Sequence, residues 1–205
     1  MRPTSKSRIA LLLAIAFALA LPILSHAQAA RAQQDAARPE LAFGYSYVHS
    51  NLPPGGCGCF SLNGGSATFT WPLGSGRFAI AGDINVVHAG AASTTSESLT
   101  LGTYTAGARY LPRLGHSALQ PFGQALIGLA HSSGTLVQGP SPAAANAGRA
   151  FAANIGGGLD LHAGSEFSIR LIEADYLPTT FDNGSNNHQN NIRIGAGVVF
   201  RLGNR

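Results

Sequence analysis

From Glu40 onward, bulky apolar residues alternate with small or polar residues along the chain. In the last such segment, Ile192, Ile194 and Phe200 alternate with Arg193 and Arg201. A period of two places successive side chains on opposite faces of a β-strand. The pattern predicts eight strands, over approximately residues 41–48, 66–73, 77–86, 99–111, 119–130, 151–162, 167–175 and 192–201.

One predicted strand interrupts its own alternation. In the segment that starts at Phe167, Arg170 lies on the polar face, but Glu173 and Asp175 have the opposite parity. An extra residue in a strand shifts all later side chains to the other face. We therefore expect a β-bulge near Leu171 and Ile172, which returns both carboxylates to the polar face.

The segments between the predicted strands alternate between long and short. The long ones cover approximately 49–65, 88–96, 131–148 and 178–189, and the short ones 72–76, 112–117 and 163–165. This sorting is typical of a barrel inserted into a membrane from one side, with short turns on the entry side. Strands of about ten residues also match the apolar thickness of an outer membrane. The fold prediction is an all-β, eight-stranded antiparallel up-and-down transmembrane β-barrel over residues 40–205.

The charged residues of the predicted strands share the face that carries small side chains. In a membrane barrel the bulky face contacts lipid, with Tyr45, Tyr47, Trp71 and Tyr110 near strand ends as interfacial aromatic residues. The charged face then lines a narrow lumen, where opposite charges neutralise one another. The predicted polar network of the lumen consists of Arg77, Asp83, Arg109, Asp160, Arg170, Glu173, Asp175, Arg193 and Arg201.

The first 29 residues have the three parts of a secretory signal peptide. A basic head precedes the apolar run 9–24, and small residues follow it. Cleavage after Ala27 and cleavage after Ala29 fit equally well. Residues 30–39 are rich in Ala and Gln and are expected to be a short periplasmic lead-in. The apolar run is shorter than the roughly 20 residues of a spanning helix.

Removal of the signal peptide changes the charge of the chain. The full sequence of 205 residues has 13 Lys and Arg against 9 Asp and Glu, a formal charge of +4. Lys6 and two arginines lie in the signal peptide, so the mature charge is near +1. Without a basic stripe to neutralise phosphates, we expect no nucleic-acid partner. The 26 glycines argue against a helical protein, and no sequence motif indicates a cofactor.

This layout resembles the small eight-stranded outer-membrane β-barrel family, that of the OmpA transmembrane domain and OmpX. The resemblance is strongest in 167–176, a penultimate strand with Arg and acidic residues, and in 191–200, a glycine-rich final strand ending in Phe200. It implies localisation in the outer membrane of a Gram-negative-type bacterium. Outer-membrane lipids, including lipopolysaccharide, and the barrel-insertion machinery are the implied partners.

Cys57 and Cys59 lie in the first long connection and are separated by one residue. An exported pair of this kind is open to several interpretations: a strained disulfide, an intermolecular or lipid linkage, or metal ligation. His49, His88 and His131 lie at the outer ends of strands and are weak candidates for a metal site at the rim. Their spacing fixes no local site, so no metal is predicted.

The segment His131-Ser132-Ser133 resembles the His-x-Ser motif of outer-membrane lipid A deacylases. In that chemistry the histidine activates the serine for acyl transfer. The acidic third member is missing, because residues 143–147 contain no Asp or Glu. We therefore do not expect an enzyme.

The main functional hypothesis is an integral outer-membrane barrel with a structural or surface-interaction role and a lumen filled by side chains. A narrow, porin-like channel for small solutes is the alternative. A soluble, exported, lipocalin-like barrel is a further alternative, and it requires Phe43, Phe69, Phe151 and Phe200 to face the interior.

Overall fold

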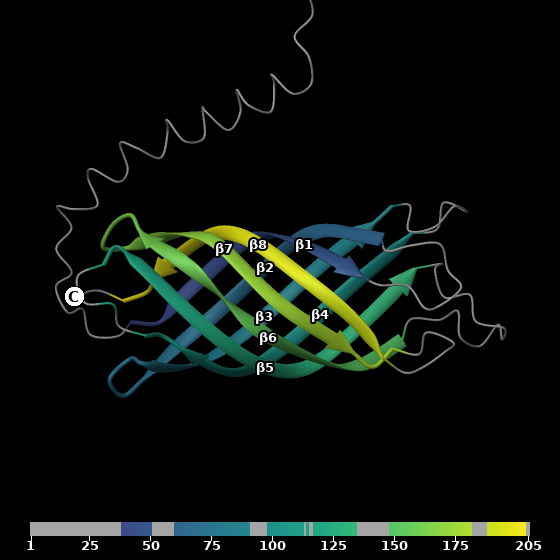
Figure 1. The fold of residues 1–205 in the computed structure, drawn as a ribbon, viewed down its shortest axis with the longest axis horizontal. Helices are drawn as coiled ribbons and strands as arrows, with labels where there is room; N and C mark the ends of the chain where they lie inside the picture. Colours follow the sequence, from purple (N-terminus) through teal and green to yellow (C-terminus); the bar gives the residue numbers. More distant parts are fainter. Residues whose placement is uncertain are drawn as a thin grey trace, which may run out of the picture.

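A computed structural model describes residues 38–50, 60–90, 98–112, 114, 117–134, 148–181 and 188–203. Within these residues the chain forms eight antiparallel strands, each paired with its sequence neighbours, and β1 pairs with β8 to close the barrel. Figure 1 shows the strands tilted steeply to the barrel axis, as closure of so few strands requires. The predicted fold class is confirmed.

The strands are longer than the alternation predicted, mainly at the end of the barrel where the long connections begin. The second strand begins at Phe60 rather than near Ser66, and the fifth runs on to Gly134. In order, they are β1 (Glu40–Ser50), β2 (Phe60–Leu73), β3 (Phe78–Ala89), β4 (Leu99–Tyr110), β5 (Leu119–Gly134), β6 (Gly148–His162), β7 (Phe167–Thr179) and β8 (Gln189–Arg201).

The predicted bulge is present in β7. Arg170 is paired with Gly197 of β8 and Glu173 with Gly195, so two residues of β7 lie opposite one residue of β8. Leu171 and Ile172 are both exposed on the outside as a result. The bulge returns Glu173 to the interior, where its side chain is buried.

Bulky apolar side chains cover the outside of the barrel. Tyr45, Ile127 and Leu129 are each more than half exposed, and similar residues continue around all eight strands. Phe43, Phe69, Phe151 and Phe200 belong to this outer surface. This placement removes the internal apolar face that the soluble-barrel alternative requires. Among the described residues, no helix is long and apolar enough to cross a membrane.

The interior is layered along the barrel axis. At the end where the long connections begin, called here the long-connection end, buried Val48, Leu62, Val87 and Leu101 form an apolar cluster, against which Phe181 packs. Buried uncharged side chains, among them Asn85 and Asn154, separate this cluster from the ion-paired side chains. The alternation placed Val48 on the lumen face, but the prediction described that face as small and charged and missed the apolar cluster.

At the opposite end, called here the short-turn end, two arginines hold the turn between β6 and β7. Arg38 donates hydrogen bonds to Glu166 and to the carbonyl oxygens of Ser165 (3.1 Å) and Gly203 (3.0 Å). Arg201 donates to the carbonyl oxygen of Gly164 at 3.0 Å. The residue that leads into β1 and the last residue of β8 are thus fastened to the same turn.

Candidate functional site in the barrel interior

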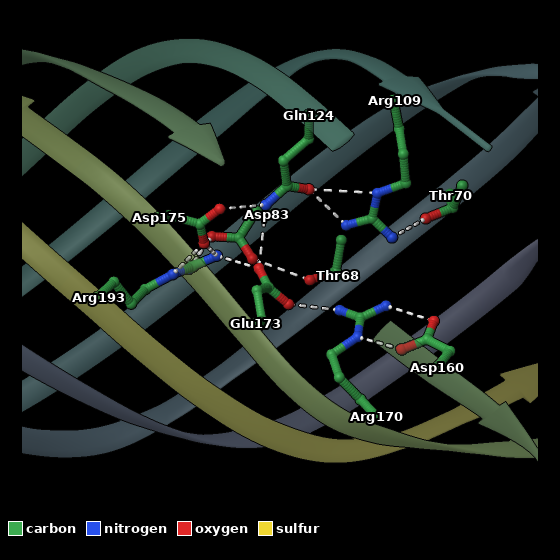
Figure 2. Close-up of polar contacts among 10 residues, drawn as sticks. All are labelled: Thr68, Thr70, Asp83, Arg109, Gln124, Asp160, Arg170, Glu173, Asp175 and Arg193. Atoms are coloured by element: carbon green, nitrogen blue, oxygen red, sulfur yellow. Dashed lines mark hydrogen bonds and ion pairs between the residues drawn. The ribbon is translucent and has the colours of Figure 1, made fainter. Parts of the chain in front are cut away.

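Arg193 of β8 is the centre of the buried ion network, because its guanidinium contacts three carboxylates. It donates to Oδ1 of Asp83 at 2.7 Å, to Oδ2 of Asp175 at 2.8 Å, and to Oε1 of Glu173. Asp83 belongs to β3, so its contact with Arg193 crosses the lumen, whereas Glu173 and Asp175 lie on the neighbouring strand β7 (Figure 2). Each of the four side chains is at most 5% exposed.

Arg170 of β7 forms the second half of the network. Its Nε and Nη2 atoms donate to the two carboxylate oxygens of Asp160 on β6 at 2.9 and 3.2 Å, the two-point geometry that suits guanidinium and carboxylate. Its Nη1 donates to Oε2 of Glu173 at 2.6 Å. Glu173 therefore joins Arg170 to Arg193, as Figure 2 shows.

Gln124 of β5 connects the acidic groups to the third arginine. Its Oε1 accepts two hydrogen bonds from Arg109, at 3.2 and 2.6 Å. Its Nε2 donates to Glu173 at 3.0 Å and to Asp175 at 3.1 Å. The amide dipole therefore points its oxygen at the cation and its nitrogen at the carboxylates, an arrangement that stabilises both.

The phenyl ring of Phe122 also belongs to the cluster and lies on the side of Gln124 that faces the short-turn end. The guanidinium carbons of Arg109 and Arg170 lie 4.4 and 4.5 Å from its centroid, within the range of cation–π attraction. Gly158 on β6 leaves room for the ring, since a Cβ atom there would lie 2.7 Å from it. Two strands therefore cooperate to place an aromatic ring among buried charges.

The network holds three guanidinium groups and four carboxyl groups, and hydrogen bonds link them to β2 as well. Thr68 donates to Oδ2 of Asp83 at 2.9 Å, and Arg109 donates to Thr70 at 3.0 Å. A cavity beside Arg170 and Arg193, lined by Gly195 and Gly197, has room for about one water molecule. The arrangement fastens opposite walls of the barrel together and fills the lumen at this level.

Seven of the nine residues predicted for the lumen network lie in this cluster. The other two do not. Arg77 lies exposed in the turn between β2 and β3, because the strand begins one residue later, at Phe78. Arg201 has the predicted parity but lies at the last position of β8, where it contacts His162 and Ser168 instead of the network.

Sequence reasoning did not assign Gln124, Phe122, Thr68 or Thr70 to the network. Their positions in the alternation already indicated the interior: Thr68 and Thr70 lie opposite Phe69 in parity, and Gln124 lies opposite Ala125. The selection of charged residues alone left these uncharged partners out.

The histidines at the long-connection end lie on different strands, on the outer surface or near it. His88 is hydrogen-bonded to Thr100 through Nδ1 at 2.9 Å. The described residues contain no group of three His, Cys, Asp or Glu side chains placed to hold a metal ion. Cys57, Cys59 and residues 1–37, with the predicted signal peptide, lie outside the described residues.

The two ends of the His-x-Ser segment share a face. His131 and Ser133 are exposed on the outside of β5, and Ser132 is buried in the interior. Among the described residues, each Asp and Glu lies in the interior or at the short-turn end, and none lies beside this pair. The described part of the chain therefore supplies no acidic third member.

No family model matches the sequence, and no curated protein matches it. Solved structures do match. The structure is similar to that of Neisserial surface protein A, with a TM-score of 0.58 and 14% identity over 80% of this chain and 97% of that one. It is also similar to Ail, the attachment invasion locus protein of Yersinia pestis, with a TM-score of 0.52 and 15% identity over 80% of this chain and 99% of that one.

These neighbours are small eight-stranded outer-membrane β-barrels. The predicted resemblance to such barrels is therefore confirmed at the level of the fold.

Proposed function

We propose that the protein is an integral outer-membrane β-barrel without enzymatic activity, which contributes to envelope structure or to surface interactions through its long connections. One observation supports this most directly: an apolar belt surrounds the barrel, while seven ionisable side chains inside it are ion-paired or hydrogen-bonded. In water such a surface would aggregate, whereas in a bilayer it meets lipid tails. A closed barrel also leaves no unpaired strand edge in lipid.

The proposed orientation places the short-turn end in the periplasm and the long connections outside the cell of a Gram-negative-type bacterium. Short periplasmic turns and longer outer connections are typical of such barrels. The barrel-insertion machinery would deliver the chain, and outer-membrane lipids would then surround it. The lack of an acidic group beside His131 and Ser133 among the described residues supports a non-enzymatic role.

Electrophoresis of the outer-membrane fraction tests the proposal. A closed membrane barrel resists unfolding by detergent at room temperature, so the unheated protein should migrate differently from the boiled protein. We expect this shift, and we expect the protein in the membrane pellet. A protein that stays in the soluble fraction and migrates identically before and after boiling would refute the membrane assignment.

A narrow channel is the second candidate. Buried polar atoms without a partner, among them both amide atoms of Asn85 and Oδ1 of Asn154, favour some hydration between the network and the apolar cluster. The apolar cluster and the ion network nevertheless fill the lumen at two levels. In planar bilayers we therefore expect no reproducible conductance steps. Steps that change in size in an Arg193→Gln variant would favour the channel instead.

A further inference from the structure

Arg149 differs from the other arginines that the structure describes. It is exposed at the start of β6, at the long-connection end, and forms no ion pair with any described residue. The other six lie elsewhere: Arg109, Arg170 and Arg193 in the interior network, and Arg38, Arg77 and Arg201 at the short-turn end. Among the described residues, Arg149 is thus the one arginine that points outward, without an ion pair, at the edge of the apolar belt nearest the long-connection end.

Further hydrogen-bond donors lie next to Arg149. His131 of β5 is paired directly with Arg149, and on its other side with Gly102 of β4. Because Gly102 has no side chain, Tyr104 extends over it: a Cβ atom at Gly102 would lie 3.7 Å from the tyrosine hydroxyl. Ser133 is exposed on the same face of β5. A guanidinium, an imidazole, a phenol and a hydroxyl therefore share one small area across three strands.

The outer surface between these donors and the middle of the barrel is strongly apolar. Ile127 and Leu129 of β5 are 63% and 58% exposed, and Phe151 of β6 is 49% exposed. Ile127 is paired on both sides with alanines, Ala106 and Ala153, so bulky and small side chains alternate across the strands. Such a surface offers apolar contact to acyl chains that run along the barrel.

We propose that Arg149, His131, Tyr104 and Ser133, called here the headgroup patch, bind the phosphate of an outer-leaflet lipid whose acyl chains lie against β4–β6. A phosphate group can accept hydrogen bonds from all four side chains. Its negative charge would also form an ion pair with Arg149, which pairs with no described carboxylate. No described acidic side chain lies near the patch to oppose it. This inference rests on the proposed function, because it requires the barrel to lie in the outer membrane.

The test uses the folded full-length protein in non-ionic detergent, titrated with lipid A and, separately, with lipid A from which the phosphates have been removed. Binding is measured by native mass spectrometry. We expect Arg149→Gln to weaken binding of phosphorylated lipid A about tenfold, the equivalent of one charge-assisted hydrogen bond. Binding of the dephosphorylated lipid should change little.

Arg77→Gln is the matched control, since Arg77 is also exposed but lies at the short-turn end. An equal loss in both variants would mean that net charge alone attracts the lipid, and no loss in Arg149→Gln would also refute the patch. Inorganic phosphate is titrated separately, and binding of inorganic phosphate as tight as that of phosphorylated lipid A would refute a lipid ligand, because the acyl chains would then add nothing. Each sample is first checked for heat-dependent mobility: failure there contradicts the proposed function, whereas a folded barrel without selective binding contradicts only the headgroup patch.

Discussion

Replacing Arg193 with Met should lower the free energy of unfolding by about 3–5 kcal/mol, the range for breaking a buried ion pair. The variant leaves Asp83, Glu173 and Asp175 buried without their shared cation. Each carboxylate keeps at least one other hydrogen-bond donor, but a donor such as Thr68 carries no positive charge. Urea unfolding of the detergent-refolded barrel, followed by its electrophoretic mobility, measures the loss.

Two comparisons separate this effect from a general effect of removing an arginine. Arg77→Met removes the same charge from an exposed turn and should change stability by less than about 0.5 kcal/mol. Combining Arg193→Met with Asp83→Asn removes one positive and one negative charge together, and it should recover a substantial part of the loss. If Arg193→Met and Arg77→Met unfold at the same urea concentration, the ion network does not stabilise the barrel.

Replacing Gly156 with Ala should also destabilise the barrel strongly. A Cβ atom at this position would overlap the carbonyl oxygen of Ala174 and the carboxylate of Asp175, and it would lie 2.6 Å from the Cα atom of Asp175. Because two of these atoms belong to the backbone of β7, a side-chain rotation alone cannot relieve the clash. We expect a loss of about 3 kcal/mol, the upper part of the usual range for overpacking.

Gly82→Ala is the control for this substitution. Gly82 also lies within a strand, but a Cβ atom there would meet nothing within 4 Å. Both variants restrict the unfolded chain equally, an effect that by itself stabilises by roughly 0.4–1 kcal/mol. The difference between their unfolding midpoints therefore reports the clash at Gly156. Equal midpoints would mean that β6 and β7 can move apart to accept the Cβ atom without a loss of stability.

The alternation of side chains was sufficient to predict the number of strands, their pairing order and the face of the residues within the predicted strands. The bulge in β7 followed from Glu173 and Asp175, because two carboxylates on the lipid-facing side would be unfavourable. Strand ends were harder to predict. Parity continues through a turn, so Arg77 had the right parity but lay beyond the start of β3.

The partners within the lumen could not be derived from parity. Contacts between Arg193 and Asp83 depend on how far each strand is shifted against the next around the closed barrel, and local alternation does not encode this shift. The apolar cluster of Val48, Leu62, Val87 and Leu101 was missed for a related reason. The interior face of one strand changes from apolar to charged along its length, whereas the prediction treated the whole face as polar.

The position of Arg193 between Ile192 and Ile194 has a consequence for assembly. If β8 joined its neighbours one residue out of register, every side chain on it would change faces. Arg193 would then enter the lipid, both isoleucines would enter the lumen, and Asp83 and Asp175 would lose their cation. Because β8 pairs with both β7 and β1, this error would occur at the step that closes the barrel. The ion network thus favours the correct register of β8 over a shifted register when the barrel closes.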